Sequence, residues 1–507
     1  MTPRRLTRRR VLAEALTGAA SLSALPLALA ACGDENASQN HSHNGSTLRR
    51  TWIDPRDDGQ LQPGPGEPFV HRTDLGPRSE ATATLATLAH VTDAHVLDAA
   101  SPARVTFLDR LGPPLQSTFR PQEALTAQVL AGAAATVRAL RPALVIQGGD
   151  LIDNDQSNEL ERALAILRGG RVDPGSGPDG YFGVQSGVDT DPFYYRPDVD
   201  APRHPGLLRR ASRTFTTRGV AAPVLPVLGD HDALVAGELV PTALTRSLAV
   251  GDRALWDLPP GLTLPPGTRT TLLASPDGPP APTQVDELLT KALAGPTVEV
   301  PADPRRRELS FAEVLGRLAP GSSTPPGRLD YVRDLGPRLR LIVLDLVRRG
   351  GGSGGLVSAH QPGWLQAQLA GAGSRHVLVV SHQPLTGSAG GEAVLQILDR
   401  APNVIAALSG HTHRNQLVAR RTTAGGYWLI STASLIDFPQ QARALRIVSA
   451  ADGRAAIQTW MLDHTYFGDL GTIARQLSYL DAQGGRPRGF AGGRTDRNAV
   501  LYLPPRV

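Results

Sequence analysis

Five short stretches of the chain end an apolar run in an acidic residue or a histidine. They read "HVTDAH", "QGGDLID", "VLGDHDAL", "VVSHQ" and "LSGHTHRN", and their chemically active residues are Asp93, His95, Asp150, Asp153, Asp230, His231, Asp232, His382, His411 and His413. Carboxylate oxygens and imidazole nitrogens bind zinc, iron and manganese, and the same groups serve as general acids and bases. Any one stretch alone is also typical of a turn, since Gly-Asp is a common turn pair. Five of them in chain order favour a single site.

The spacing within two of these stretches is that of neighbouring side chains on a strand. Asp93 and His95 are two residues apart, and so are His411 and His413. An extended backbone would direct both members of each pair to one face. The carboxylate of Asp150 is suited to bridging two cations, because its two oxygens can bind separately. These patterns predict a metal site built from distant parts of the chain.

The elements that must position these residues are buried strands alternating with helices. Continuous apolar runs predict strands over Thr84–Thr92, Pro142–Gly149, Ala222–Gly229, His376–Ser381 and Asn403–Gly410. Helical patterns lie between several of them, over Gln122–Leu140, Glu159–Leu167, Pro362–Leu369 and Glu392–Leu398. This alternation predicts an α/β architecture, in which ligands bind at the carboxyl ends of the strands.

The motifs "DAH", "GGDLID", "GDHD", "SH" and "GHTH" together resemble, in this order, those of the calcineurin-like metallophosphoesterases. The resemblance covers roughly residues 84–415 and implies an α/β fold with a two-sheet β-sandwich flanked by helices and long loop insertions. It also implies two divalent or trivalent metal ions, with zinc, iron and manganese left open as their identity. The implied reaction is hydrolysis of phosphate monoesters or diesters through a dinuclear metal centre and metal-bound hydroxide.

The resemblance carries a role to each motif residue. It implies one metal held by Asp93, His95 and His413, a bridge through Asp150, and a second metal held by Asp230, His382 and His411. His231 would protonate the leaving oxygen, and Asp153 would orient His231. Asp232 would support the loop of the "GDHD" motif. Arg414 is a candidate phosphate contact, although an exposed loop arginine fits its position at least as well. His464, in "MLDHTYF", is interpreted as a structural histidine.

Asp230 departs from the family pattern, which usually has asparagine at this position. With two divalent ions, the carboxylates of Asp93 and Asp150 leave a net charge of +2, and an ionised Asp230 lowers it to +1. The sequence therefore predicts a slower enzyme than an asparagine-bearing relative, or one that favours the less charged diesters. A protonated Asp230, or one turned away from the metals, would remove this effect.

Composition and the N-terminus bear on partners and location. The 507 residues carry a formal net charge of +5 and the pI is about 9.7, but residues 1–31 alone carry +4. The remainder is nearly neutral, which argues against nucleic-acid binding. The segment "TRRRVLA" resembles a twin-arginine export signal and "LAAC" resembles a lipobox ending at Cys32, the single cysteine. These features predict a bacterial lipoprotein, lipid-anchored through Cys32 at the outer face of the cytoplasmic membrane in the cell envelope.

The predicted organisation has four parts. Residues 1–31 form the signal peptide, 32–80 a flexible tether and lead-in, 81–465 the metallophosphoesterase domain, and 466–507 a C-terminal extension. Two stretches rich in glycine or proline, about 170–215 and 251–330, are expected to be insertions with little regular structure. The oligomeric state leaves no trace in the sequence.

Two other functions remain open at this level. One is a non-catalytic surface lipoprotein that retains the fold as a binding scaffold. The other is hydrolysis of an ester other than a phosphoester, since metal ions polarise any suitable ester. Against the scaffold stands the complete set of ligand residue types, because a decaying site is expected to lose histidines first.

Overall fold

The computed structural model describes residues 44–111, 118–187, 191, 193–257, 282–295, 297–319, 327–450, 452–465, 468–484 and 490–505. The predicted signal peptide (1–31), the predicted lipidation site Cys32 and the first part of the predicted tether lie outside these residues. Within the described part of the chain, no helix has the length and apolar character that crossing a bilayer requires.

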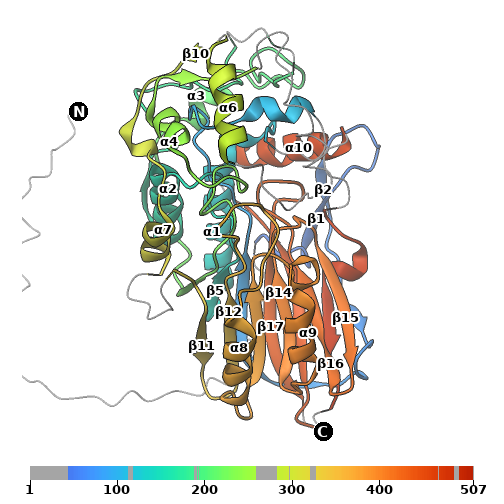
Figure 1. The fold of residues 1–507 in the computed structure, drawn as a ribbon. Helices are drawn as coiled ribbons and strands as arrows, with labels where there is room; N and C mark the ends of the chain where they lie inside the picture. The colour runs from blue at the N-terminus through green and yellow to red at the C-terminus, as the bar shows by residue number, and fades with distance from the viewer. Residues whose placement is uncertain are drawn as a thin grey trace, which may run out of the picture. The chain divides into compact units, whose positions relative to one another are not determined.

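Two β-sheets pack against each other through a shared apolar core (Figure 1). The larger sheet has the strand order β3-β19-β18-β17-β4-β5-β8, with bounds Val70–Arg72, Ala499–Tyr502, Ala455–Asp463, Gln441–Ala450, Ala81–Val91, Leu144–Gln147 and Val224–Pro226. The smaller has the order β11-β12-β13-β14-β16-β15, with bounds Tyr331–Leu335, Leu339–Leu344, His376–Ser381, Val404–Ser409, Gly425–Ser431 and Gln416–Thr422. Leu88 and Leu445 of the larger sheet share one buried cluster with Leu378 and Leu408 of the smaller. The predicted two-sheet sandwich is therefore confirmed.

Strand direction determines where the motifs end. In the larger sheet β4, β5 and β8 run parallel, with Val91 opposite Gln147 and Gln147 opposite Pro226. In the smaller sheet β12, β13, β14 and β16 run parallel, and Val380 lies opposite Leu408. Parallel neighbours present their carboxyl ends at the same edge, so the loops that follow them converge. All five predicted strands are present.

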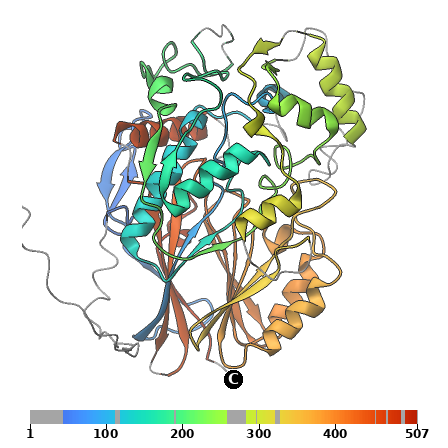
Figure 2. The same cartoon turned by 90° about the vertical axis from the view of Figure 1, so that its left-hand side faces the viewer.

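Helices cover the outer face of each sheet, as the sequence predicted (Figure 2). Their bounds are α1 Thr126–Leu140, α2 Ser157–Arg168, α8 Gln361–Ala370 and α9 Gly391–Asp399. Helix α2 buries Leu160, Ala163 and Leu167, residues spaced three and four apart, against the larger sheet. Leu365 of α8 and Leu395 of α9 pack on the smaller sheet in the same way.

The two predicted insertions contain more regular structure than expected. The first holds β6 (Gly170–Val172) and α3 (Leu207–Ala211) and ends where β7 (Phe215–Thr217) begins. The second holds β9 (Arg253–Ala254), α6 (Pro282–Leu293), β10 (Val298–Glu299) and α7 (Phe311–Leu318). Helix α4 (Ala243–Val250) precedes the second insertion. In α7 a capping box between Ser310 and Glu313 starts the helix, and Val314 and Leu318 are buried. The first insertion is still mostly irregular, as expected, whereas in the second the proline content masked short helical patterns.

Both ends of the described chain belong to the fold. Regular structure begins before residue 80, with a hairpin of β1 (Arg50–Ile53) and β2 (Gln62–Pro65), followed by β3. Beyond residue 466, helix α10 (Asp469–Gln483) precedes β19, which pairs with β18 on one side and β3 on the other. The predicted lead-in and extension thus supply two strands of the larger sheet.

Candidate dinuclear metal centre

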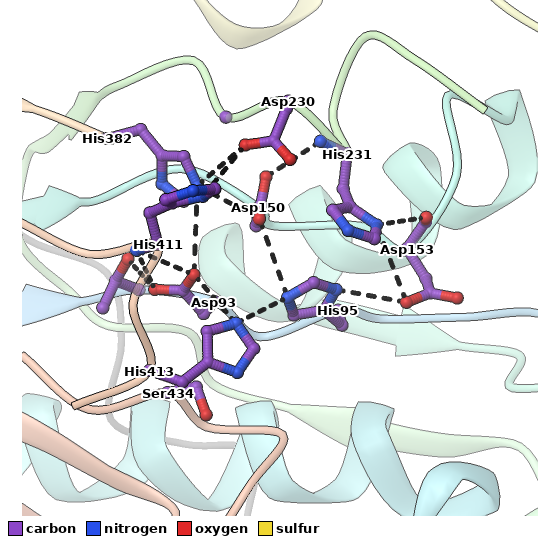
Figure 3. A network of polar contacts seen from close by, with 12 residues as sticks. Asp93, His95, Asp150, Asp153, Asp230, His231, His382, His411, His413 and Ser434 are labelled. Carbon is purple, nitrogen blue, oxygen red and sulfur yellow. Dashed lines mark hydrogen bonds and ion pairs between the residues drawn. The ribbon is translucent and has the colours of Figure 1, made fainter. Parts of the chain in front are cut away.

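Five loops from the two sheets bring the motif residues to one place (Figure 3). Asp93 and His95 follow β4, Asp150 follows β5, and Asp230 follows β8 in the larger sheet. His382 follows β13, and His411 with His413 follows β14, in the smaller sheet. The cluster therefore lies where the carboxyl ends of strands from both sheets meet, as predicted.

The first group of potential ligands consists of Asp93, His95 and His413. One ligand atom from each lies within 4.8 Å of the others. The Nε2 atoms of His95 and His413 are 3.3 Å apart, and His413 Nε2 is 3.2 Å from Asp93 Oδ1. Asp93 is fully buried and His95 is nearly so.

The second group consists of Asp150, Asp230, His382 and His411, again with ligand atoms within 4.8 Å of one another. His382 Nε2 lies 3.1 Å from Asp150 Oδ2 and 3.3 Å from Asp230 Oδ1. His411 Nδ1 lies 3.3 Å from the same Asp230 oxygen. Asp230 therefore points into the group and is not turned away.

Asp150 connects the two groups. Its Oδ2 atom is 3.1 Å from His382 Nε2 in the second group and 3.7 Å from His95 Nε2 in the first. Its Oδ1 atom accepts a hydrogen bond from the backbone N–H of His231 at 2.9 Å. One carboxylate oxygen thus faces both groups, which is the position that a bridging ligand requires.

The hydrogen bonds of three histidines show that a cation fits here. His95 Nδ1 donates to Asp153 Oδ1 (3.1 Å), His382 Nδ1 to Gly148 O (2.8 Å) and His413 Nδ1 to Asp437 Oδ2 (2.6 Å). Since carboxylate and carbonyl oxygens only accept, each Nδ1 carries the proton and each neutral ring has its lone pair on Nε2. These lone pairs face one another or face carboxylate oxygens, an arrangement that is repulsive until a cation lies between them.

When no cation is bound, protons occupy the histidine nitrogens that face the carboxylates. Burial alone would lower the pKa of His413, but the carboxylates of Asp93 and Asp437 raise it to about 9. Burial alone would raise the pKa of Asp230, but His411 and His382 hold it well below its usual range. In the protein without metal, protons thus offset the negative charge of the carboxylates. The same negative potential attracts metal ions, which compete with those protons.

The backbone at these loops differs from the sequence expectation. Asp93, His95, Asp150, His411 and His413 all have φ between 43° and 63°, in the left-handed region. The prediction that each Asp-x-His or His-x-His pair lies on extended backbone is therefore wrong. Each such residue costs about 1–3 kcal/mol, which the surrounding loop hydrogen bonds and a bound cation would have to offset.

Glycines make the close approach of these loops possible. A Cβ at Gly229 would lie 2.1 Å from the backbone N of Asp150, and one at Gly149 would lie 2.3 Å from His382 Nδ1. Both contacts are too short for any side chain larger than hydrogen. The glycines of "GGD" and "GDHD" are thus required by packing between neighbouring ligand loops.

His231 lies beside the first group and has its own partners. Its Nδ1 donates to the backbone carbonyl of Asp153 at 2.7 Å, which leaves Nε2 available, and 22% of its side chain is exposed. Burial would lower the pKa of His231, but Asp150, Asp230 and Asp153 raise it overall. The carboxylate of Asp153 contacts His95 at 3.1 Å and lies 3.9 Å from His231 Nδ1, and its role in orienting His231 stays a prediction.

Two residues that contact the ligand side chains were not predicted from the sequence. Asp437 accepts from His413 Nδ1 and also binds Arg120 Nε at 2.6 Å, so that the carboxylate orients a ligand histidine. Gln383 donates to Asp230 Oδ1 at 3.0 Å. Gln383 directly follows a motif histidine and could have been found, whereas Asp437 lies in "LIDFPQ", which has no motif signal.

The remaining predicted residues are placed as follows. Asp232 accepts from the backbone N–H groups of Leu151 (2.8 Å) and Gly229 (2.9 Å) and so ties two ligand loops together, as predicted. Arg414 is exposed, and its role in phosphate binding stays a prediction. His464 is buried outside the cluster, with Nε2 3.2 Å from Gln440 Oε1.

Comparisons with known proteins yield likenesses of structure only. No family model matches the chain, and no curated protein sequence matches it. Among solved structures, a dimetal phosphatase from Danio rerio aligns with 14% identity and a TM-score of 0.37 over 76% of this chain and 100% of its own. A purple acid phosphatase from yellow lupin seeds aligns with 11% identity and a TM-score of 0.32 over 80% of this chain and 55% of its own. At these identities and TM-scores neither likeness assigns a function to this chain.

Proposed function

We propose that this protein is a metal-dependent phosphoesterase of the calcineurin-like type. The observation that carries the proposal is the pair of adjoining ligand groups with Asp150 Oδ2 between them. All seven residues that the sequence resemblance named as ligands belong to these two groups. A non-catalytic scaffold has no need of this complete set, which requires five residues in left-handed backbone.

The residues of the chain divide the catalytic work. One cation would be held by Asp93, His95 and His413, and the other by Asp230, His382 and His411. Asp150 would contact both cations. Two bound cations would neutralise phosphate charge and lower the pKa of a water molecule that attacks phosphorus. The bond from His231 Nδ1 to the carbonyl of Asp153 leaves Nε2 free of that contact, and His231 would protonate the leaving oxygen through Nε2.

Metal analysis combined with two assays tests the proposal. We expect about two metal ions per chain by plasma mass spectrometry, turnover of p-nitrophenyl phosphate or bis-p-nitrophenyl phosphate, and loss of turnover after treatment with a chelator. Turnover should return when zinc, iron or manganese is added back. A chain without metal would contradict the enzyme proposal, and a metal-loaded chain that hydrolyses neither compound would favour the binding scaffold.

Asp230 provides a test of how the site discriminates between substrates. Because Asp230 lies 3.3 Å from His382 Nε2 and contributes its charge to the second group, Asp230→Asn adds one positive charge to the loaded site. We expect turnover of the dianionic monoester to rise relative to that of the monoanionic diester, by a factor of the order of ten. Steady-state kinetics with both p-nitrophenyl compounds measure this ratio. A fall in turnover as large as that of His382→Ala would show that the carboxylate is needed and that the predicted sign is wrong.

We also propose that the enzyme is exported and attached to the membrane by lipid on Cys32. The support is the sequence pattern "TRRRVLA" followed by "LAAC". Mass spectrometry of the mature N-terminus tests this proposal, because it would show chain cleavage before Cys32 and the added acyl mass.

A further inference from the structure

A second pocket shares no residue with the two ligand groups. It lies between the β1–β2 hairpin, the end of β18 and the first turns of α10, and Figures 1 and 2 show this hairpin beside that helix. Its volume is about 440 Å³, within the range of roughly 300–1,000 Å³ found for small-molecule sites. The residues that matter among its lining are Ser46, Arg50, Trp52, Asp463, His464 and Arg475.

The charge of the lining is positive. Arg49, Arg50 and Arg475 line the pocket together with a single carboxylate, that of Asp463. Arg475 is 4% exposed, and its guanidinium lies 4.7 Å from the ring centroid of Trp52. Burial lowers the pKa of Arg475 despite the nearby carboxylate of Asp463, and burial raises the pKa of Asp463, so a further counter-charge would favour the charged form of Arg475. An anion in the pocket would supply that counter-charge.

Three buried polar atoms of lining residues have no hydrogen-bond partner. They are Ser46 Oγ, His464 Nδ1 and Arg475 Nε, and all three residues are more than nine-tenths buried. Arg475 Nη2 donates to His464 O, and His464 Nε2 contacts Gln440 Oε1. Since buried polar groups in folded proteins are nearly always paired, the three atoms leave hydrogen-bonding capacity unused in the residues that line the pocket.

Helix α10 adds backbone donors at the same place. The residue before it, Gly468, has no side chain to cap the first N–H groups, and Gly468, Gly471 and Thr472 all line the pocket. A helix N-terminus carries partial positive charge and favours anions. The acidic residue of the first turn, Asp469, is paired with Arg210 and does not line the pocket.

We propose that this pocket binds a phosphate group carried by a small organic molecule or by a lipid headgroup. Arg50 on the hairpin and Arg475 on the helix both line the pocket, and their guanidinium carbons lie 5.5 Å and 4.7 Å from the ring centroid of Trp52. Guanidinium groups suit the several oxygens of a phosphate. The volume leaves room for an organic part beside the phosphate. The pocket begins at Asn44, 12 residues after Cys32, a distance of at most about 43 Å along extended chain. If Cys32 is lipidated as proposed, the pocket can reach headgroups.

Inorganic phosphate bound to the metal-loaded full chain, measured by equilibrium dialysis, is the first test. Because the metal centre should bind phosphate as well, the comparison is made in an Asp150→Ala background that weakens this binding, and the pocket is measured as the part of the binding that a change in its lining removes. We expect one phosphate site there, weakened roughly 10- to 100-fold by Arg50→Gln. The matched control is Arg56→Gln, whose side chain is 70% exposed in the loop of the same hairpin and lies outside the pocket. Arg50→Gln should leave turnover unchanged when Asp150 is present.

Vesicles distinguish the two sources of the phosphate group. The full chain with Cys32→Ser is sedimented with vesicles of phosphatidylglycerol and phosphatidylcholine in equal parts. A severalfold loss of sedimentation with Arg50→Gln but not with Arg56→Gln assigns the pocket to a headgroup, whereas phosphate binding without this loss assigns it to a free organic phosphate. If Arg50→Gln changes neither measurement, the pocket holds water only and the proposal fails. If the metal centre proved inactive, the effects of Arg50→Gln on phosphate dialysis and on vesicle sedimentation would be unchanged. Failure of the proposed phosphoesterase function can therefore be told apart from failure of the pocket proposal.

Discussion

Replacing Asp150 with alanine should lower turnover of p-nitrophenyl phosphate by about 10³-fold or more, because metal-based charge stabilisation contributes several kcal/mol. Its Oδ2 atom lies 3.1 Å from His382 Nε2 and 3.7 Å from His95 Nε2, so its loss weakens both ligand groups together. The variant should also retain fewer than two metal ions per chain. Asp93 Oδ1 also lies near both groups, 3.2 Å from His413 Nε2 and 3.9 Å from His382 Nε2, so Asp93→Ala should lower metal content as well.

The measurement combines steady-state kinetics with metal content on the same preparation. Asp173→Ala is the control, since Asp173 is 53% exposed in a loop outside the cluster and its removal leaves the ligand groups intact. Circular dichroism shows whether the sheet content survives the Asp150 change. An Asp150→Ala protein that keeps two metal ions and near-normal turnover would contradict a shared dinuclear centre.

Replacing His231 with glutamine should slow hydrolysis of an alkyl phosphate such as glycerol 2-phosphate by about 10²–10⁴-fold, the usual contribution of a general acid. The same change should slow p-nitrophenyl phosphate far less, because nitrophenolate leaves readily without a proton. The geometric basis is the bond from Nδ1 to the carbonyl of Asp153, which leaves Nε2 as the donor.

His231 has one competing role that the experiment separates. One of its ring nitrogens lies within 4.8 Å of ligand atoms of His95 and Asp150, so His231 could instead help to hold a cation. A ligand role predicts reduced metal content and equal slowing of both substrates. An acid role predicts unchanged metal content and slowing that depends on the leaving group. His231→Gln kinetics with the two substrates, read beside metal analysis, decide between them.

Much of the fold and of the cluster could be predicted because its signals are local. Each ligand loop follows a strand whose residues are apolar without interruption, as in "HVLVVS", and such runs are recognisable from composition alone. The direction of parallel strands then places Asp150 beside Asp93 at the edge of the larger sheet, and His382 beside His411 at the edge of the smaller sheet. The sequence also revealed the unusual Asp230, although not that Gln383 binds it.

Only the tertiary structure decided the features that depend on contacts between distant segments. Left-handed backbone at Asp93 and four other ligands has no residue pattern of its own, since glycine is absent at these positions and φ is imposed by neighbouring loops. Asp437 reaches His413 because the antiparallel pair β15 and β16 brings the chain back over 24 residues. The pocket at Arg475 joins segments about 400 residues apart through the bridge between Ser46 and Leu462 at the end of β18 and the placement of α10. Hydrophobic patterning specifies which residues are buried, but the partner of a buried polar atom is set by packing geometry that the linear sequence does not encode locally.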